Sequence, residues 1–166
     1  MPVSIRQLQT HEWETLKSTR LYALQADPQA FRSTASIEKR LTEDDWKAQL
    51  TNQDIAVFVL CNDDEPIGIT YSGIDKNDPS RKTAIFWGSW IKKDFRQKRL
   101  SKLLYNSRID WANKHISIQK IIITHRESNK TSQKAILSNG FKITSQSPKL
   151  WHDGVTEDEI FYERKL

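Results

Sequence analysis

The chain has 166 residues, of which 37% are hydrophobic and 28% are charged, and this predicts one globular domain over residues 1–166. Its net charge is +5, and a single cysteine, Cys61, excludes an intrachain disulfide. Every apolar run is shorter than the roughly 20 residues that cross a bilayer, which argues against a membrane protein. Because the N-terminus lacks the basic-then-apolar pattern of a signal peptide, we expect a cytoplasmic location.

The first third of the chain predicts one strand and two helices. A short strand is expected at Val3–Leu8. Apolar residues then recur at helical spacing from Thr10, which can cap the helix, to about Gln25, and the Asp27-Pro28 pair ends it. A capping box at Thr42–Asp45 predicts a second helix from about Glu43 to Leu50.

The middle of the chain predicts a change from antiparallel to parallel pairing. Three strands are expected at Ile55–Cys61, Pro66–Ile74 and Thr83–Ile91. Short polar connections join them, which is typical of an antiparallel meander. A helix at Leu100–His115 then leads into a strand at Ile118–Thr124. Because a right-handed crossover of this kind joins parallel strands, the fourth and fifth strands are expected to be parallel.

The last segment predicts one helix and two strands. Asn129 can cap the helix, Gly140 ends it, and Phe141 follows as a buried anchor. The final strands are expected at Lys142–Gln146 and Glu159–Arg164. The whole pattern predicts an α/β fold with a mixed sheet, in the order strand, two helices, three strands, helix, strand, helix and two strands.

The charge of the chain is concentrated between the fourth strand and the helix that follows. The eleven residues Lys92–Lys102 hold six basic side chains and one acidic one, a surplus equal to the net charge of the whole chain. The N–H groups and the dipole at a helix N-terminus attract phosphate, so the run predicts a polyphosphate ligand. A solvated basic face is the structural alternative. One compact patch argues against a nucleic-acid duplex as the partner.

Three features resemble the GCN5-related N-acetyltransferase (GNAT) family. Arg96–Ser101 follows that family's acetyl-CoA signature, except that Arg99 replaces the first glycine and Ser101 the second small residue. Arg99 costs little if its backbone is helical, because only a positive φ demands glycine. Asn129 precedes Gly140-Phe141 at the family's spacing, and the Pro28–Phe31 segment is similar to one branch. The resemblance implies a GNAT-like acyl-CoA N-acyltransferase fold and acetyl transfer from acetyl-CoA, as co-substrate, to a primary amine.

The resemblance also implies which residues bind the cofactor. The pantetheine arm would pair with the end of the fourth strand, the phosphates would bind the basic run, and the next helix would approach with two polar residues. Capping alone is an equally good explanation for Asn129. The implied cofactor-binding residues are Ser89, Trp90, Ile91, Arg96, Gln97, Lys98, Arg99, Leu100, Ser101, Lys102, Asn129 and Ser132.

The catalytic groups are less clearly indicated. Many family members have a tyrosine acid four residues before the Gly-Phe glycine, where this chain has Ile136. The fourth strand has no Glu or Asp to act as a base, so a water relay through His125 or Glu127 is the catalytic hypothesis, with a plain loop role as the alternative for each. Since Ile136 cannot donate a proton, a non-catalytic acyl-CoA-binding module remains the alternative function.

Two further expectations concern aromatic residues and partners. Trp87 and Trp90 are three residues apart, so we expect them on opposite faces of the strand, with core packing favoured over an acceptor pocket. The histidines show no metal-like spacing, so no metal is expected. The late strands leave both a monomer and a homodimer open.

Overall fold

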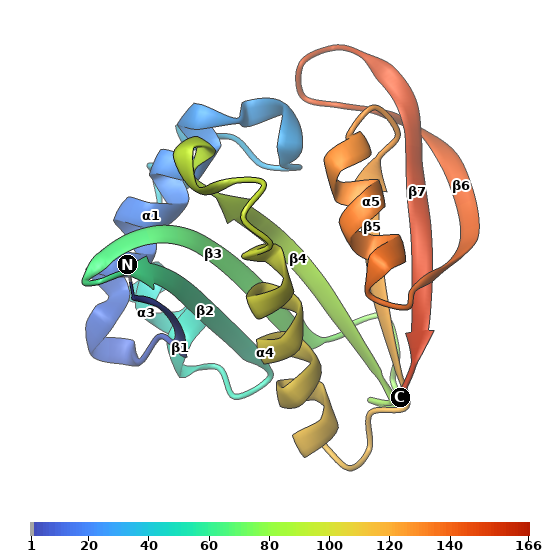
Figure 1. Ribbon diagram of the computed structural model, residues 1–166, viewed down its shortest axis with the longest axis horizontal. Helices are drawn as coiled ribbons and strands as arrows, with labels where there is room; N and C mark the ends of the chain where they lie inside the picture. The colour runs from blue at the N-terminus through green and yellow to red at the C-terminus, as the bar shows by residue number, and fades with distance from the viewer. Residues whose placement is uncertain (1) are drawn as a thin grey trace.

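The computed structural model describes residues 2–166 and contains a seven-stranded mixed sheet with helices on both faces. The sheet order is β1-β2-β3-β4-β5-β7-β6 (Figure 1). The strands are β1 (Val3–Gln7), β2 (Ile55–Asn62), β3 (Glu65–Ile74), β4 (Thr83–Ile91), β5 (Lys120–Arg126), β6 (Lys142–Leu150) and β7 (Thr156–Lys165). No helix in the described part of the chain is long and apolar enough to span a membrane.

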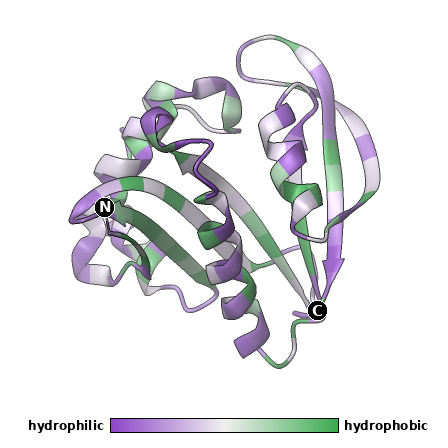
Figure 2. Ribbon diagram, viewed as in Figure 1, coloured by the Kyte–Doolittle hydropathy of each residue, from purple (hydrophilic) through white to green (hydrophobic). Residues whose placement is uncertain are grey.

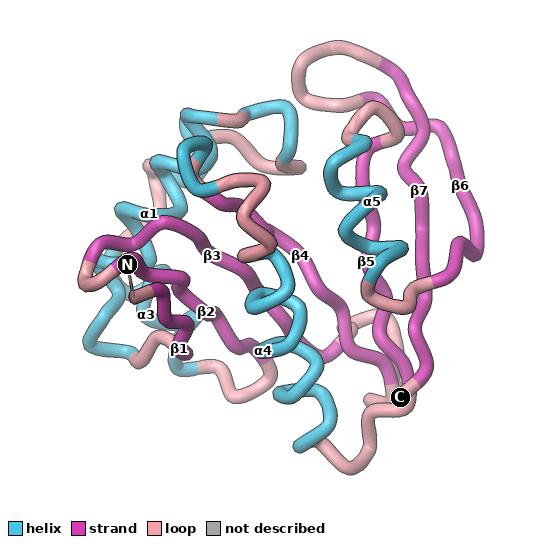
Figure 3. The backbone as a smooth tube through the Cα atoms, in the orientation of Figure 1, coloured by secondary structure: helices cyan, strands magenta, loops and turns pink. Residues whose placement is uncertain are grey.

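Within residues 2–166, five α-helices and three short 3-10 helices connect the strands (Figure 3). The α-helices are α1 (Trp13–Ala26), α2 (Ala35–Glu38), α3 (Glu43–Thr51), α4 (Ser101–Lys114) and α5 (Lys130–Ser138). The 3-10 helices are η1 (Thr10–Glu12), η2 (Pro28–Ala30) and η3 (Lys93–Phe95). The short helix α2 was not predicted, because four residues are too few to show a helical period.

Two of the three predicted N-terminal helix caps are confirmed. Thr42 caps α3 through a bond from Asp45 N at 3.1 Å, and Asn129 caps α5. The cap predicted at Thr10 is wrong. Its hydroxyl lies 3.3 Å from the hydroxyl of Thr51, and the backbone N–H of Gln9 instead donates to Glu12 at 2.9 Å.

The strand pairing follows the prediction, with shifted ends. β2, β3 and β4 form the antiparallel meander, and β4 pairs with β5 in parallel. β5 begins two residues later than expected, and β6 and β7 are both longer than predicted. These late strands are mostly polar, so their hydrophobic pattern marked only the first half of β6 and the central part of β7 (Figure 2).

A β-bulge in β4 overturns the prediction for the two tryptophans. Trp87 lies opposite Tyr71, whereas Trp90 lies opposite Ile69, and Gly88 between them has a positive φ of 67°. The partners on β3 are two residues apart, so the two tryptophans share one face. Both pack against the core cluster on the α1 and α3 side of the sheet. The extra residue of the bulge explains the error.

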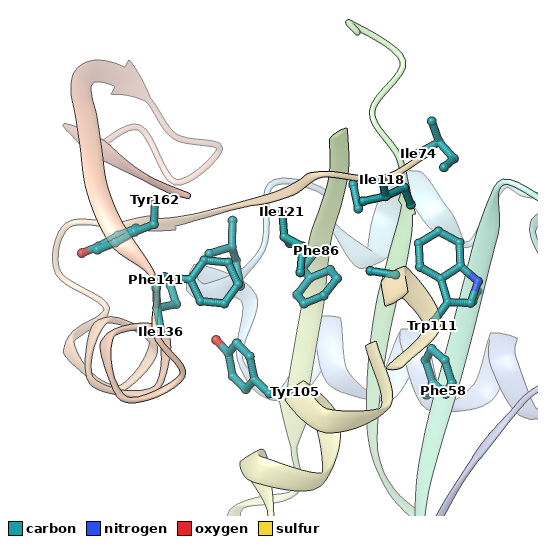
Figure 4. Packing of buried hydrophobic residues seen from close by; sticks show 14 of the residues in the cluster. Phe58, Ile74, Phe86, Tyr105, Trp111, Ile118, Ile121, Ile136, Phe141 and Tyr162 are labelled. Atoms are coloured by element: carbon teal, nitrogen blue, oxygen red, sulfur yellow. The ribbon is translucent and has the colours of Figure 1, made fainter. Parts of the chain in front are cut away.

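The core on the opposite face joins the two halves of the sheet. Phe86 from β4 and Tyr105 from α4 both meet the ring of Phe141 edge-on, at centroid distances of 6.2 and 6.1 Å. Ile136 and Tyr162 lie on the other side of that ring (Figure 4). Phe141 is therefore the buried anchor that the sequence predicted, with 3% of its surface exposed.

Candidate active site

The sheet opens between β4 and β5. Their four register pairs end at Phe86 and Ile123, although β4 continues to Ile91 and β5 to Arg126. In Figure 1 the two strands lie side by side near their N-terminal ends and separate toward their C-terminal ends. The β5-facing edge of β4 therefore has no strand partner beyond Phe86 among the described residues. Such an edge can pair with an extended ligand.

The loop between β4 and α4 follows directly after the unpaired part of β4. The backbone N–H groups from Gln97 to Ser101 donate no hydrogen bond within residues 2–166. Gln97 and Arg99 both have a φ of 61°, and Leu100 returns to the right-handed helical region. Left-handed and right-handed residues in succession turn neighbouring N–H groups toward one side, which creates an anion-binding concavity. Arg99 therefore does not have the right-handed helical backbone that the sequence analysis assumed, and its left-handed conformation carries a steric cost.

The basic side chains of the loop fall into two groups. Arg96 points back into the protein, where Nη2 donates to Asp27 at 2.5 Å and Nε donates to the carbonyl of Ile91 at 2.7 Å. Lys102 donates to the Asn139 side chain at 2.8 Å. Lys93, Lys98 and Arg99 are exposed and form no ion pair in the described part of the chain. The unpaired positive charge of the loop therefore lies at these three residues, and Lys98 and Arg99 belong to the stretch with free N–H groups.

The predicted residues of β4 point to both faces of the sheet. Ser89 shares a hydrogen bond of 2.7 Å with the Thr70 hydroxyl. Ile91 packs in the cluster with Leu100. Trp90 lies on the opposite face, and its Nε1 donates to Asp27 at 2.7 Å. Asp27 thus receives Trp90 and Arg96 together and connects the end of α1 to the loop, a role that sequence reasoning missed.

The polar residues at the start of α5 lie beyond β5. The Asn129 side-chain oxygen accepts the N–H of Ser132 at 3.1 Å, which satisfies one free donor of the helix end. Both residues are partly exposed. The capping role of Asn129 is therefore present, and it leaves the amide nitrogen of Asn129 available for a ligand.

His125 and Glu127 are not brought together. His125 lies against Tyr162, with its Nε2 2.9 Å from the tyrosine hydroxyl and its Nδ1 2.6 Å from the carbonyl of Arg126. Burial lowers the pKa of His125, which favours the neutral ring. Glu127 is exposed beyond the end of β5, and its N–H donates to the carbonyl of Asp158. Ile136, at the position of the usual tyrosine acid, is 1% exposed in the core.

Charged side chains that the sequence did not indicate surround the other face of β5. Arg126 is bound by Asp153 at 2.8 Å and by Glu157 at 2.6 Å. Arg126 lowers the pKa of Asp153, and hydrogen bonds from Ser128 and Arg126 lower the pKa of Glu157. Glu159 is 6% exposed and accepts bonds from Thr124 and Arg32. No local motif marks these residues, because their partners are far apart in the sequence. Residues 2–166 contain no group of three or more His, Cys, Asp or Glu side chains that could hold a metal ion.

Comparison with known proteins agrees with this geometry. The family model described as an acetyltransferase (GNAT) domain matches residues 4–142. No curated protein matches the sequence.

Solved structures share the whole fold at low sequence identity. A GNAT-family acetyltransferase from Streptococcus pneumoniae has a TM-score of 0.84 and 15% identity, covering 99% of this chain and 100% of that one. The yncA protein from Salmonella typhimurium, solved with its cofactor acetyl-CoA, has a TM-score of 0.81 and 18% identity, covering 100% and 95%. The ribosomal-protein-S5-alanine acetyltransferase from Vibrio fischeri has a TM-score of 0.79 and 17% identity, covering 98% and 92%.

Proposed function

The chain belongs to the GNAT acetyltransferases, and from this premise we propose that it transfers the acetyl group of acetyl-CoA to a primary amine. It is an acetyl-CoA-dependent N-acetyltransferase. The primary-amine acceptor is our inference from that family membership. The observation that carries the proposal is the row of unpartnered N–H groups from Gln97 to Ser101 at the start of α4.

These residues fit the cofactor in two ways. Backbone N–H groups at a helix N-terminus bind phosphate oxygens, and Lys98 and Arg99 add two exposed cations. The unpaired edge of Trp87–Ile91 can pair with the amide groups of the pantetheine arm. Asn129 and Ser132 lie across the opening, at the start of α5. When bound, acetyl-CoA supplies a thioester whose carbonyl carbon accepts the amine.

The first test measures binding and turnover separately. Acetyl-CoA should raise the melting temperature, because a ligand that binds only the folded state stabilises it. Thiol release should appear with at least one member of a panel of primary amines. Lys98→Ala combined with Arg99→Ala should weaken binding and reduce its salt dependence, since two exposed cations are lost. Lys39→Ala combined with Arg40→Ala, outside the loop, is the matched control.

Two outcomes would contradict the proposal. Unchanged acetyl-CoA affinity in the Lys98 and Arg99 double variant would remove the loop as the phosphate site. Tight acetyl-CoA binding without thiol release on any amine would instead indicate a non-catalytic acyl-CoA-binding module. The second outcome is tested because Ile136, at the usual acid position, cannot donate a proton.

A further inference from the structure

A buried carboxylate lies where β4 and β5 separate. Thr124 is the first residue of β5 beyond the last pair with β4, and its hydroxyl donates to Glu159 at 2.9 Å. His125, the next residue along, packs against Tyr162 on the α5 side. Since neighbouring residues of a strand point to opposite faces, Thr124 and Glu159 lie on the other face. Glu159 therefore reaches the opening of the sheet from the side opposite α5.

Glu159 is the only buried Asp or Glu among residues 2–166. A carboxylate without compensating partners is costly to bury, so its position calls for an explanation. Its ionic partner is Arg32, whose side chain is 56% exposed. An exposed arginine on a loop can leave the carboxylate, whereas the hydrogen bond from Thr124 stays within the sheet. The charge on Glu159 is therefore available to a ligand cation that replaces Arg32.

The segment that carries Arg32 lies over the C-terminal half of the sheet. His152 Nε2, from the loop between β6 and β7, lies 2.8 Å from the carbonyl of Pro28 and 2.9 Å from that of Phe31. Residues 28–32 therefore connect the end of α1 to the strands beyond the opening. A molecule that reaches Glu159 passes this segment and touches Arg32.

The charges around Glu159 favour a ligand that carries both signs. Arg32 and Lys149 flank one carboxylate, and burial together with the charge of Arg32 lowers the pKa of Lys149. Arg126, the other nearby cation, is already bound by Asp153 and Glu157. One negative group beside two cations leaves a positive excess, which opposes an acceptor that is only cationic and suits one that also has a carboxylate.

We propose that Glu159 binds the amino group of the acceptor, and that Arg32 and Lys149 bind a carboxylate close to that amino group. The acceptor is thus of the amino-acid class. This inference rests on the proposed acetyl transfer. Glu159 takes one proton from the ammonium group, and the nitrogen then forms the C–N bond as the C–S bond breaks. The nitrogen loses its second proton to the leaving thiolate, which gives the N-acetyl amino acid and free coenzyme A thiol, and Glu159 releases the first proton to solvent.

The test compares amino acids with the amines left when their carboxylate is removed. Phenylalanine with phenethylamine, and lysine with cadaverine, are two such pairs in a panel of the common amino acids. Wild type should favour the amino acids by at least about tenfold in kcat/KM. Arg32→Ala combined with Lys149→Ala should abolish that preference, chiefly by raising KM for the amino acids, while turnover of the plain amines remains.

Glu159→Gln should lower kcat/KM by about 10²-fold, as expected for loss of a general base, and Glu159→Asp should restore part of it. The matched control is Glu163→Gln, on the same strand and face, whose partner is Lys120 at 3.0 Å. Acetyl-CoA binding, measured by thermal shift, should be unchanged in all these variants. Binding of the amino acid to the coenzyme A complex, measured by calorimetry, should be lost in Glu159→Gln.

The outcomes separate this inference from the proposed function. Turnover within twofold of wild type in Glu159→Gln, or equal use of amino acids and their plain amines by wild type, would overturn the inference and leave acetyl transfer intact. Absence of amino-acid binding to the wild-type complex would also overturn it. If acetyl-CoA itself does not bind, the proposed function fails first.

Discussion

The two sides of the opened sheet are built in different ways. β4 and the loop to α4 contribute backbone groups, held by unusual conformations at Gly88, Gln97 and Arg99. β5 and β7 contribute side chains held by charge, through the contacts of Arg126 and Glu159. The first side suits a ligand that presents phosphates and amides. The second suits a ligand that presents an ammonium and a carboxylate. The comparison indicates that cofactor and acceptor binding depend on different physical terms and can be disrupted separately.

Gly88→Ala should produce the largest effect on the β4 side. Its φ of 67° strains any other residue, and a new Cβ would lie 2.6 Å from Tyr71 Cδ2. The Tyr71 ring cannot move freely, because it stacks on Trp87 at a centroid distance of 5.4 Å. We expect a loss of about 3 kcal/mol in the free energy of unfolding, from strain and overpacking together, with weaker acetyl-CoA binding. Urea unfolding and calorimetric titration would measure the two.

Gly154→Ala is the matched control for strain without a clash. Gly154 has a φ of 82°, and a Cβ there would meet nothing within 4 Å. Its loss should be about 1 kcal/mol, with unchanged acetyl-CoA affinity. If both variants lose the same free energy of unfolding, the close approach of Tyr71 to position 88 does not contribute to the cost of Gly88→Ala.

The sequence predicted the parts of the fold that follow from hydrophobic period and helix caps. The meander, the parallel crossover and the helix between Asn129 and Gly140 are all confirmed. The bulge at Gly88 was not predicted, although an isolated glycine within a strand often marks a bulge. Because of this one inserted residue, Trp87 and Trp90 share a face, whereas simple alternation predicts opposite faces.

The candidate site was predicted only where its residues are close in sequence. The basic run marked the loop before α4, because six cations within eleven residues are visible without a structure. The partner of Arg96, Asp27, is 69 residues away, and the partner of Arg32, Glu159, is 127 residues away. Contacts between residues so distant depend on the order and register of the strands. The hydrophobic pattern does not predict these precisely enough to identify individual side-chain pairs.

Arg99→Gly should increase the stability of the protein, in contrast to Gly88→Ala, and by a smaller amount. Glycine adopts a φ of 61° without the penalty that arginine carries, so the variant should be more stable than wild type by about 1 kcal/mol. It should also bind acetyl-CoA more weakly, because one exposed cation is lost. Thermal unfolding and titration at two salt concentrations would measure both.

Arg99→Ala is the control, since it removes the same charge and keeps the strain. The two variants should bind acetyl-CoA alike at high salt and differ in stability. If Arg99→Gly is no more stable than Arg99→Ala, the left-handed conformation at this position does not carry the expected cost.

The smallest expected effect concerns His125 and tests whether it has a structural or a catalytic role. Burial lowers the pKa of the folded-state ring below its usual value of about 6.5. The unfolded chain then binds the proton more readily, so this contribution to stability is complete above about pH 6.5 and is lost as pH falls through the folded pKa.

Wild type should therefore lose stability between neutral and mildly acidic pH more steeply than His125→Gln, whose side chain does not titrate. Urea unfolding from pH 5 to 8 would measure the difference. The two nitrogens of His125 already contact Tyr162 and the carbonyl of Arg126, so we expect His125→Gln to keep kcat within a few fold of wild type at pH 8. A loss of about 10²-fold in kcat without a change in the pH dependence of stability would instead restore the water relay through His125. That result would place a catalytic group on the α5 side of β5 and would contradict the division of roles between the two sides of the sheet.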